Sequence, residues 1–261
     1  MNLGVEERVC VVTGSTSGIG LETARLLATE GAIVVVAGRR AERVEEARRE
    51  TGAALGVACD LSLAEAPGAL IGQAEEAFGR VDCLVNNVGL ARQVSFEELS
   101  DEDWEAMWQL NVMSYLRTIR AVVPGMRARG RGRIVNVSST AGKRPSTGMP
   151  NYSVTKAAVL SLSRLVADLY SKDGILCNAV CPGPTASPAW VAPGGLADQV
   201  SGRTGKSREQ VLEDVGKGRP IGRLAEPAEI AAVLAFLCSE RASYVTGAAW
   251  SVDGGTVPVI I

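Results

Sequence analysis

The stretch Thr13-Gly14-Ser15-Thr16-Ser17-Gly18-Ile19-Gly20 lies between a short apolar run and a helical pattern. Its glycines are spaced G-x3-G-x-G, which suits a tight turn, close approach of a pyrophosphate and close helix–strand packing. The helix that follows offers free N–H groups and the positive end of its dipole to phosphate. The stretch therefore predicts a dinucleotide-binding turn. The candidate cofactor contacts within it are Gly14, Thr16, Ser17, Gly18, Ile19 and Gly20.

Strand and helix patterns alternate along the chain around this turn. Apolar runs without polar alternation, such as Cys10-Val11-Val12, are typical of strands covered on both faces. We predict a doubly wound, Rossmann-type α/β fold, with a seven-stranded parallel sheet and helices on both faces, in one domain spanning residues 1–261. The expected strands are 9–13, 33–37, 54–58, 83–86, 133–138, 176–181 and 248–252, and the expected helices are 19–30, 41–50, 63–78, 101–128, 152–171 and 227–239.

Residues 188–222 interrupt the alternation. Glycines and prolines punctuate this polar, partly helical segment, which follows the sixth expected strand, at the edge of the sheet where such folds bind ligands. A long insertion in a compact domain is usually a lid or a binding element. We predict a substrate-binding lid; a surface excursion without function is the alternative.

Composition excludes several kinds of site and partner. The chain has 261 residues and no histidine, which rules out Ser-His and Cys-His nucleophiles and His-containing zinc sites. A net charge of −2 argues against nucleic acid or an anionic membrane as the main partner. Without an apolar run of about 18 residues or a signal region, we expect a cytoplasmic protein. The six scattered cysteines predict buried thiols, with no metal site.

The end of the second expected strand bears on the choice of cofactor. An acidic side chain there would bind the ribose 2′-hydroxyl of NAD, but Gly38 occupies the position and Arg39 and Arg40 follow. A guanidinium binds phosphate well, so we predict NADP(H) in preference to NAD(H). The alternative is that the two arginines only begin the charged helix at 41–50.

Tyr152 and Lys156 are one helical turn apart, so their side chains share a face. A phenol has a pKa of about 10, which is about 3 units above pH 7. Ionising it at pH 7 therefore costs about 4 kcal/mol. A positive charge about 4 Å from the phenolate, at an effective dielectric constant of about 20, stabilises the ionised form by on the order of 4 kcal/mol. Lys156 could therefore make Tyr152 a general acid or base. A surface Tyr–Lys pair is the alternative.

These motifs together resemble the short-chain dehydrogenase/reductase family, in its single-domain branch that includes 3-oxoacyl-[acyl carrier protein] reductases. The resemblance extends from Thr13 to the Val-Asp-Gly-Gly stretch at 252–255. It implies a catalytic tetrad of Asn111, Ser139, Tyr152 and Lys156, and a Val in place of Ala at position 88 departs from the family's N-N-A-G stretch. The further cofactor contacts that it implies are Asp60, Leu61, Asn87, Gly89, Tyr152, Lys156, Pro182, Gly183, Thr185 and Ser187.

The resemblance implies an oxidoreductase that interconverts a ketone and a secondary alcohol by hydride transfer. Ser139 and Tyr152 would bind the substrate oxygen, Tyr152 would transfer the proton, and Lys156 would lower its pKa. Asn111, a poor helix former inside 101–128, predicts a local distortion of that helix. A 3-oxoacyl-thioester reductase, an NAD-recycling epimerase or dehydratase, and a non-catalytic cofactor-binding regulator are the alternatives.

The expected partner is a small-molecule ketone or alcohol, together with further copies of the chain. The helix at 152–170 is apolar on nearly every face, and the tail 257–261 is apolar as well. Such a helix needs cover on more than one side, so we predict a homodimer or homotetramer.

Overall fold

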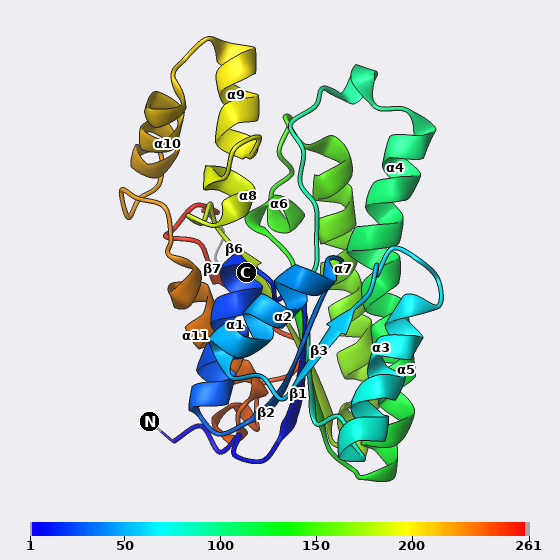
Figure 1. Ribbon diagram of the computed structural model, residues 1–261. Helices are drawn as coiled ribbons and strands as arrows, with labels where there is room; N and C mark the ends of the chain where they lie inside the picture. The colour runs from blue at the N-terminus through cyan, green and yellow to red at the C-terminus, as the bar shows by residue number, and fades with distance from the viewer. Residues whose placement is uncertain (1, 259–261) are drawn as a thin grey trace.

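The computed structural model describes residues 2–258, and a parallel sheet forms its centre (Figure 1). Within these residues, seven strands lie in the order β3-β2-β1-β4-β5-β6-β7, and every neighbouring pair is parallel. The predicted strands are confirmed to within one or two residues at their ends. They are β1 (Val9–Thr13), β2 (Ile33–Gly38), β3 (Leu55–Ala58), β4 (Cys83–Asn86), β5 (Gly132–Val137), β6 (Ile175–Pro182) and β7 (Ala249–Val252).

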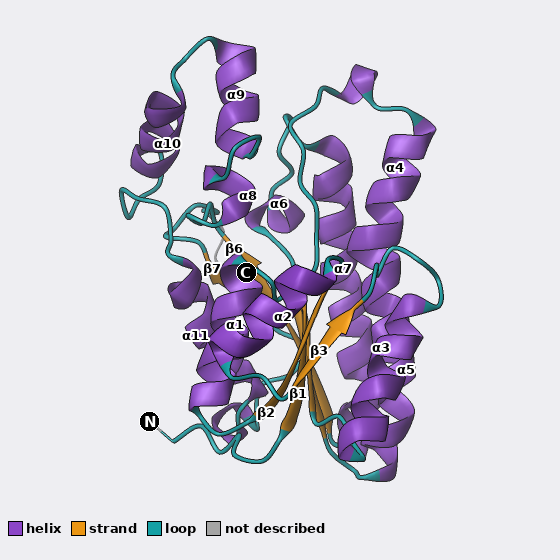
Figure 2. Ribbon diagram, in the orientation of Figure 1, coloured by secondary structure: helices purple, strands orange, loops and turns teal. Residues whose placement is uncertain are grey.

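Helices cover both faces of the sheet, as Figure 2 shows. The α-helices are α1 (Gly18–Thr29), α2 (Ala41–Thr51), α3 (Ala66–Phe78), α4 (Asp101–Trp108), α5 (Ser114–Ala128), α6 (Thr140–Lys143), α7 (Pro150–Tyr170), α8 (Pro188–Val191), α9 (Leu196–Thr204), α10 (Arg208–Lys217) and α11 (Pro227–Cys238). Short 3-10 turns are η1 (Phe96–Glu98), η3 (Ser171–Asp173) and η4 (Glu240–Ala242). No helix within residues 2–258 is both long and apolar enough to cross a bilayer.

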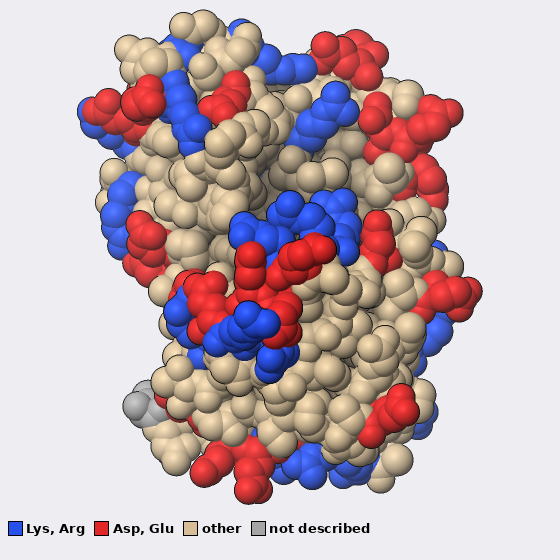
Figure 3. Space-filling view, viewed as in Figure 1, with Lys and Arg blue, Asp and Glu red and all other residues tan. Residues whose placement is uncertain are grey.

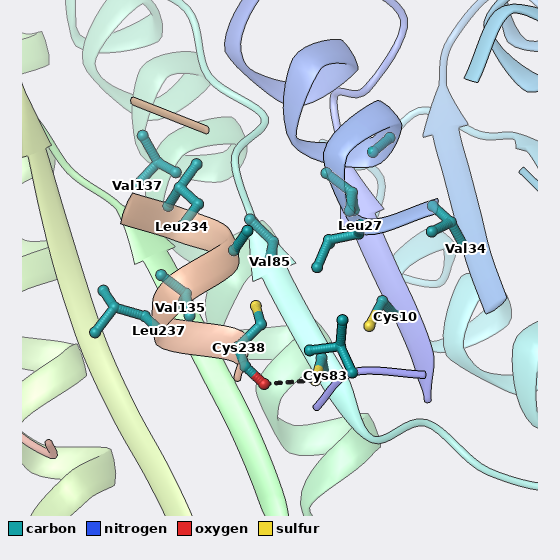
Figure 4. Packing of buried hydrophobic residues seen from close by; sticks show 14 of the residues in the cluster. Cys10, Leu27, Val34, Cys83, Val85, Val135, Val137, Leu234, Leu237 and Cys238 are labelled. Atoms are coloured by element: carbon teal, nitrogen blue, oxygen red, sulfur yellow. Dashed lines mark hydrogen bonds between the residues drawn. The ribbon is translucent and has the colours of Figure 1, made fainter. Parts of the chain in front are cut away.

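The strand β1 shows how the sheet forms two cores. Val9 and Val11 pack on one face against α3, α5 and α7, whereas Cys10 and Val12 pack on the other face against α1 and α11. Figure 4 shows the second cluster, with Leu27 of α1 and Leu234 of α11 over the strands. Because successive strand residues point to opposite faces, an unbroken apolar run fits only a sheet covered on both sides. The predicted doubly wound α/β class is confirmed.

The predicted helix at 101–128 is divided by a π-helical turn. Residues Gln109–Met113 (η2) form this turn between α4 and α5, and Asn111 lies within it. The predicted distortion is therefore present. The other helices differ less: α3 begins three residues later than expected, with Pro67 in its first turn, and the short α6 was not predicted. Residues 259–261 of the apolar tail lie outside the described residues.

The order of the strands determines where a ligand can bind. The chain runs from β1 outward to β2 and β3, then returns to β4 on the opposite side of β1. The loops after β1 and β4 consequently leave the sheet in opposite directions and open a crevice at its carboxyl-terminal edge.

Candidate active site

A cavity of about 820 Å³ lies at this carboxyl-terminal edge. In Figure 3 it appears as a hollow, with Lys and Arg side chains gathered just below it. Gly20, Arg40 and Asn111 do not line it. The sequence-predicted residues that do line it are Gly14, Thr16, Ser17, Gly18, Ile19, Arg39, Asp60, Leu61, Asn87, Gly89, Ser139, Tyr152, Lys156, Pro182, Gly183, Thr185 and Ser187.

The glycine turn between β1 and α1 forms the floor of the cavity. Gly14 has a φ of +61°, and a Cβ there would lie 2.9 Å from the Cα of Val88. A Cβ on Gly20 would lie 2.4 Å from the carbonyl oxygen of Gly14, so Gly20 permits the packing under the turn. The side-chain amide of Asn87 donates to the carbonyl oxygens of Thr13 and Gly14, both at 3.0 Å. The loop after β4 thus supports the turn after β1.

The first turn of α1 suits a pyrophosphate. Its N-cap residue is Ser17, whose side chain makes no capping hydrogen bond within the described chain. Ser17, Gly18 and Ile19 line the cavity, so the amino-terminal end of the helix faces it. Uncapped N–H groups and the positive end of a helix dipole favour an anionic ligand. These residues fit the diphosphate of a nicotinamide dinucleotide.

Asp60 and Arg39 lie at the other end of the cavity. The carboxylate of Asp60 accepts hydrogen bonds from the backbone N–H and the hydroxyl of Ser62, at 3.0 and 2.8 Å. Those bonds, and more weakly the charge of Arg39, lower the pKa of Asp60. Asp60 therefore remains ionised and accepts hydrogen bonds, while Arg39 brings a positive charge to the same end.

Position 38 packs closely against the glycine turn. A Cβ on Gly38 would lie 2.6 Å from the methyl group of Thr16, which itself lines the cavity. Arg40 is the exposed N-cap residue of α2 and lies outside the cavity. Of the two predicted arginines, Arg39 is thus the one placed to meet a ligand.

Ser139 and Tyr152 both follow β5 and both line the cavity. Ser139 is the N-cap residue of α6, and its hydroxyl accepts a hydrogen bond of 3.1 Å from the backbone N–H of Ala141. Tyr152 lies in the first turn of α7. Loss of water around its hydroxyl raises the pKa of Tyr152, and a hydrogen bond with Ser139 acts in the opposite direction. The two hydroxyls can therefore bind one substrate oxygen.

Lys156 lies one turn further along α7 and is buried. Its ammonium donates a hydrogen bond of 2.8 Å to the carbonyl oxygen of Val137 and lies 5.8 Å from the centre of the Tyr152 ring. Burial lowers the pKa of Lys156 to about 7. In this structure the ammonium bonds to Val137 and burial has the largest effect on the pKa of Tyr152, so the predicted effect of Lys156 on the phenol stays a prediction.

Asn111 acts behind the cavity rather than on its surface. Its amide accepts from the backbone N–H of Leu90 and donates to the carbonyl oxygen of Leu90, both at 3.0 Å, and it also donates to the hydroxyl of Thr155 at 3.2 Å. The π-helical turn brings Asn111 to the loop after β4. A Cβ on Gly89 would meet Lys156 Nζ at 3.3 Å and Asn111 Oδ1 at 3.4 Å, so Gly89 permits this close packing.

The loop after β6 closes the cavity from the far side. Pro182 ends β6, and the buried Thr185 donates a hydrogen bond of 3.0 Å to the carbonyl oxygen of Gly183. A Cβ on Gly18 would lie 3.1 Å from the Cβ of Ser187. This loop therefore reaches the glycine turn and narrows the space between them.

Comparison with known proteins agrees with this geometry. A family model described as enoyl-(acyl carrier protein) reductase matches residues 14–257. The uncharacterized oxidoreductase YvrD of Bacillus subtilis is 38% identical, over 98% of this chain and 99% of that protein. The 3-oxoacyl-[acyl-carrier-protein] reductase of Thermotoga maritima is 33% identical, over 97% and 98% of the two chains. The chain belongs to the short-chain dehydrogenase/reductase family.

A solved structure supports the same assignment. L-sorbose reductase of Gluconobacter frateurii, in complex with NADPH and L-sorbose, is 38% identical and matches with a TM-score of 0.92 over the whole of both chains. This short-chain dehydrogenase/reductase is therefore an NAD(P)-dependent enzyme that acts on CH–OH and C=O groups.

Residues 188–222 of this short-chain dehydrogenase/reductase form one wall of the cavity. In Figure 1, α8, α9 and α10 stand above the sheet, and Trp190, Leu196 and Val215 of this segment line the cavity. The side chain of Gln199 accepts a hydrogen bond of 2.9 Å from the backbone N–H of Gln93, which lies on the opposite wall. The predicted lid function remains a prediction, but its residues do border the site.

Sequence reasoning missed Tyr115, which lies in α5 directly behind Lys156. The Tyr115 side chain is fully buried, and its ring centre is 5.2 Å from Lys156 Nζ. The available signal was its position four residues after Asn111, which places both residues on one side of a helix.

Proposed function

We propose that this enzyme is an NADP(H)-dependent oxidoreductase that interconverts a ketone and a secondary alcohol, with Tyr152 as general acid and base. The observation that carries this proposal is the convergence of Ser139, Tyr152 and Lys156 on the cavity that the glycine turn also lines. The NADPH complex of the similar L-sorbose reductase adds support.

The proposed mechanism assigns a task to each side chain. When bound, the dinucleotide supplies the hydride for the carbonyl carbon. The hydroxyls of Ser139 and Tyr152 donate hydrogen bonds to the carbonyl oxygen, where negative charge develops. Tyr152 transfers its proton to that oxygen. Lys156, with a pKa lowered to about 7, can release a proton near neutral pH and so restore the phenol.

The walls of the cavity favour a small substrate of mixed polarity. Leu90, Met149 and Trp190 contribute apolar surface, and Gln93 contributes an amide. We propose that residues 188–222 act as the lid over this part of the cavity. A small ketone fits these walls, and a 3-oxoacyl thioester is the alternative substrate class that the test below distinguishes.

A panel of ketones, 3-oxoacyl thioesters and secondary alcohols, followed by absorbance of the reduced nicotinamide, tests the proposed reaction. We expect net consumption of NADPH with at least one ketone. Protein that retains non-exchanging NAD and shows no net consumption of NADPH with any substrate would overturn the proposal and favour an epimerase or dehydratase.

Arg39 supports the preference for NADP(H), because it lines the cavity near Asp60 while position 38 is a glycine and carries no acidic side chain. We expect the KM for NADPH to be below that for NADH. Arg39→Ala should raise the KM for NADPH about tenfold, the effect of losing one charge-assisted contact, with little change for NADH. Arg40→Ala is the matched control. A wild-type preference for NADH would contradict the assignment.

We also propose a homodimer or homotetramer, as the exposed apolar side chains of α7 suggest. Val154, Leu165 and Leu169 are each about half exposed on the outer side of this helix. Apolar surface of this kind is usually covered in an assembly. Light scattering should give a mass of at least two chains, and a monomer would contradict the proposal.

A further inference from the structure

Tyr115 in α5 is a buried residue beside the site that the proposed mechanism does not use. Its side chain is 0% exposed, which is the deepest burial a phenol can have. The hydroxyl donates to the carbonyl oxygen of Val88 at 2.9 Å and also lies 3.1 Å from the carbonyl oxygen of Val137. Val88 follows β4 and Val137 ends β5. Tyr115 therefore joins two neighbouring strand ends at the rear wall of the cavity.

Lys156 shares these partners. Its ammonium donates to the carbonyl oxygen of Val137 at 2.8 Å and to the hydroxyl oxygen of Tyr115 at 3.5 Å, and it lies over the Tyr115 ring. The single hydroxyl hydrogen of Tyr115 is directed at backbone carbonyls, so a lone pair of its oxygen is available to the ammonium. An ammonium has three N–H donors, so two bonds to the rear wall leave one for the cavity.

Tyr115 can accept a hydrogen bond from Lys156, but it does not act as a base. Burial raises its pKa well above the ordinary value, so the side chain stays a neutral phenol. Within residues 2–258, no carboxylate lies within 4.0 Å of Lys156. The carbonyl oxygen of Val137, the hydroxyl oxygen of Tyr115 and its aromatic face are consequently the groups that contact this buried charge, and Cys181 is the nearby ionisable group that raises its pKa.

We propose that Tyr115 is a positioning residue, which holds the ammonium of Lys156 against the rear wall and raises the fraction of Lys156 that is charged near neutral pH. This inference rests on the proposed function, in which Lys156 serves Tyr152. Tyr115 acts through Lys156 and touches neither the substrate nor the reacting atoms.

Removing the hydroxyl of Tyr115 tests the proposal. Tyr115→Phe retains the ring, and therefore the packing of the core and the aromatic face under Lys156. The ammonium loses one acceptor, which disfavours its charged form, so the pKa of Lys156 should fall by about 0.5 to 1 unit. Tyr170→Phe is the matched control, since Tyr170 lies at the far end of α7 and contacts Arg127 instead.

The decisive measurement does not depend on turnover. The chain has five lysines, so NMR of protein labelled at the lysine ε-carbon can follow each ammonium, and the signal lost in Lys156→Met identifies Lys156. The Lys156 signal should titrate at a lower pH in Tyr115→Phe than in the wild type and in Tyr170→Phe. An equal titration in Tyr115→Phe and the wild type, or an equal fall in Tyr170→Phe, would overturn the proposal.

A kinetic measurement then links this shift to the reaction. In the alcohol-oxidising direction neutral Lys156 must accept the proton that Tyr152 takes up, so a lower pKa of Lys156 should lower the pH of half-maximal kcat by about 0.5 to 1 unit in Tyr115→Phe, with the KM for the alcohol little changed. If the NMR titration of Lys156 shifts but the pH dependence of kcat does not, Tyr115 contacts Lys156 but does not act on Tyr152 through it, and that part of the proposal is overturned. Absence of any turnover in the wild type would overturn the proposed function alone.

Discussion

At the amino-terminal edge of the sheet, Arg8 and Arg133 are buried and both contact the carboxylate of Glu240. At the carboxyl-terminal edge Lys156 is buried, and no carboxylate of residues 2–258 contacts it. Desolvation lowers the pKa of all three cations. The arginines lie close to the thiols of Cys83 and Cys238, two core residues that Figure 4 labels. Lys156 instead lines the large cavity.

This difference separates a structural charge from a functional one. A buried cation that is matched by a carboxylate is tied to the fold, because removing its partner leaves an uncompensated buried charge and destabilises the protein. A buried cation held by neutral groups beside a cavity costs stability, and an enzyme retains it for chemistry. Substitutions at the two edges should therefore have opposite effects on stability and activity.

Tyr152→Phe should have the largest effect. The variant keeps the ring but cannot transfer a proton, so kcat should fall by about 10² to 10⁴ while NADPH binding changes less than about threefold. Steady-state kinetics and NADPH fluorescence titration measure the two quantities. Residual activity above about a tenth of the wild-type value would refute the role assigned to Tyr152.

Lys156→Met should stabilise the protein and inactivate it. Because the pKa of Lys156 falls from 10.5 to about 7 on folding, its penalty is fully present below pH 7 and is relieved as the pH rises towards 10.5. At pH 7 we expect a gain in the free energy of unfolding on the order of 3 kcal/mol, and a smaller gain at pH 9.5. Urea unfolding at both pH values measures this, with the exposed Lys172→Met as control. If Lys156→Met lowers the free energy of unfolding at pH 7, the charge of Lys156 stabilises the fold and the distinction from Arg8 and Arg133 is wrong.

Glu240→Gln, at the amino-terminal edge of the sheet, should destabilise the protein without inactivating it. Arg8 and Arg133 would lose their shared carboxylate, and the free energy of unfolding should fall by about 1 to 2 kcal/mol, less than for a fully buried pair because the Glu240 side chain is 45% exposed. The kcat should remain at the wild-type value. Glu213→Gln, which breaks the exposed Lys217–Glu213 pair of α10, should change stability by less than about 0.5 kcal/mol. A fall in kcat for Glu240→Gln would break the distinction between the two edges.

Arg203→Met should have the smallest effect. Arg203 in α9 contacts Glu98 of η1 at 2.6 Å, and both side chains are exposed. Losing an exposed pair should raise the KM for the ketone by no more than about threefold and leave kcat unchanged. Lys206→Met removes a pair with Asp214 that stays within residues 188–222, and it should change neither constant. An equal effect of both variants would argue against a lid that closes onto the loop of Glu98.

The glycine turn shows what could be predicted from the sequence. Gly14 adopts a left-handed conformation and Gly20 packs against a backbone carbonyl, so the residue type itself records the local geometry. The apolar run of β1 likewise records a strand covered on both faces. Asn111 indicated a distortion because its side chain suits a helix interior poorly, and the π-helical turn lies there.

Tyr115 and Glu240 show what could not be predicted. Tyr115 reads as an ordinary apolar position of α5, and its role follows from contacts with Val88 and Val137, which lie 27 and 22 residues away. Glu240 meets Arg8 from 232 residues along the chain. The sequence also could not predict where the Lys156 ammonium points. The spacing of four residues places Tyr152 and Lys156 on one face of a helix, but it does not determine which oxygen the long lysine side chain binds.

The amino-acid sequence by itself determined the doubly wound sheet and the glycine turn, because strand burial and glycine backbone conformations are local properties, whereas most of the predicted site residues came from the resemblance to a known family. Only the tertiary structure decided which buried charge has a counter-charge and which one faces a cavity. Electrostatic energy depends on distances and on exclusion of water, and both are set by segments that the fold brings together from distant parts of the chain.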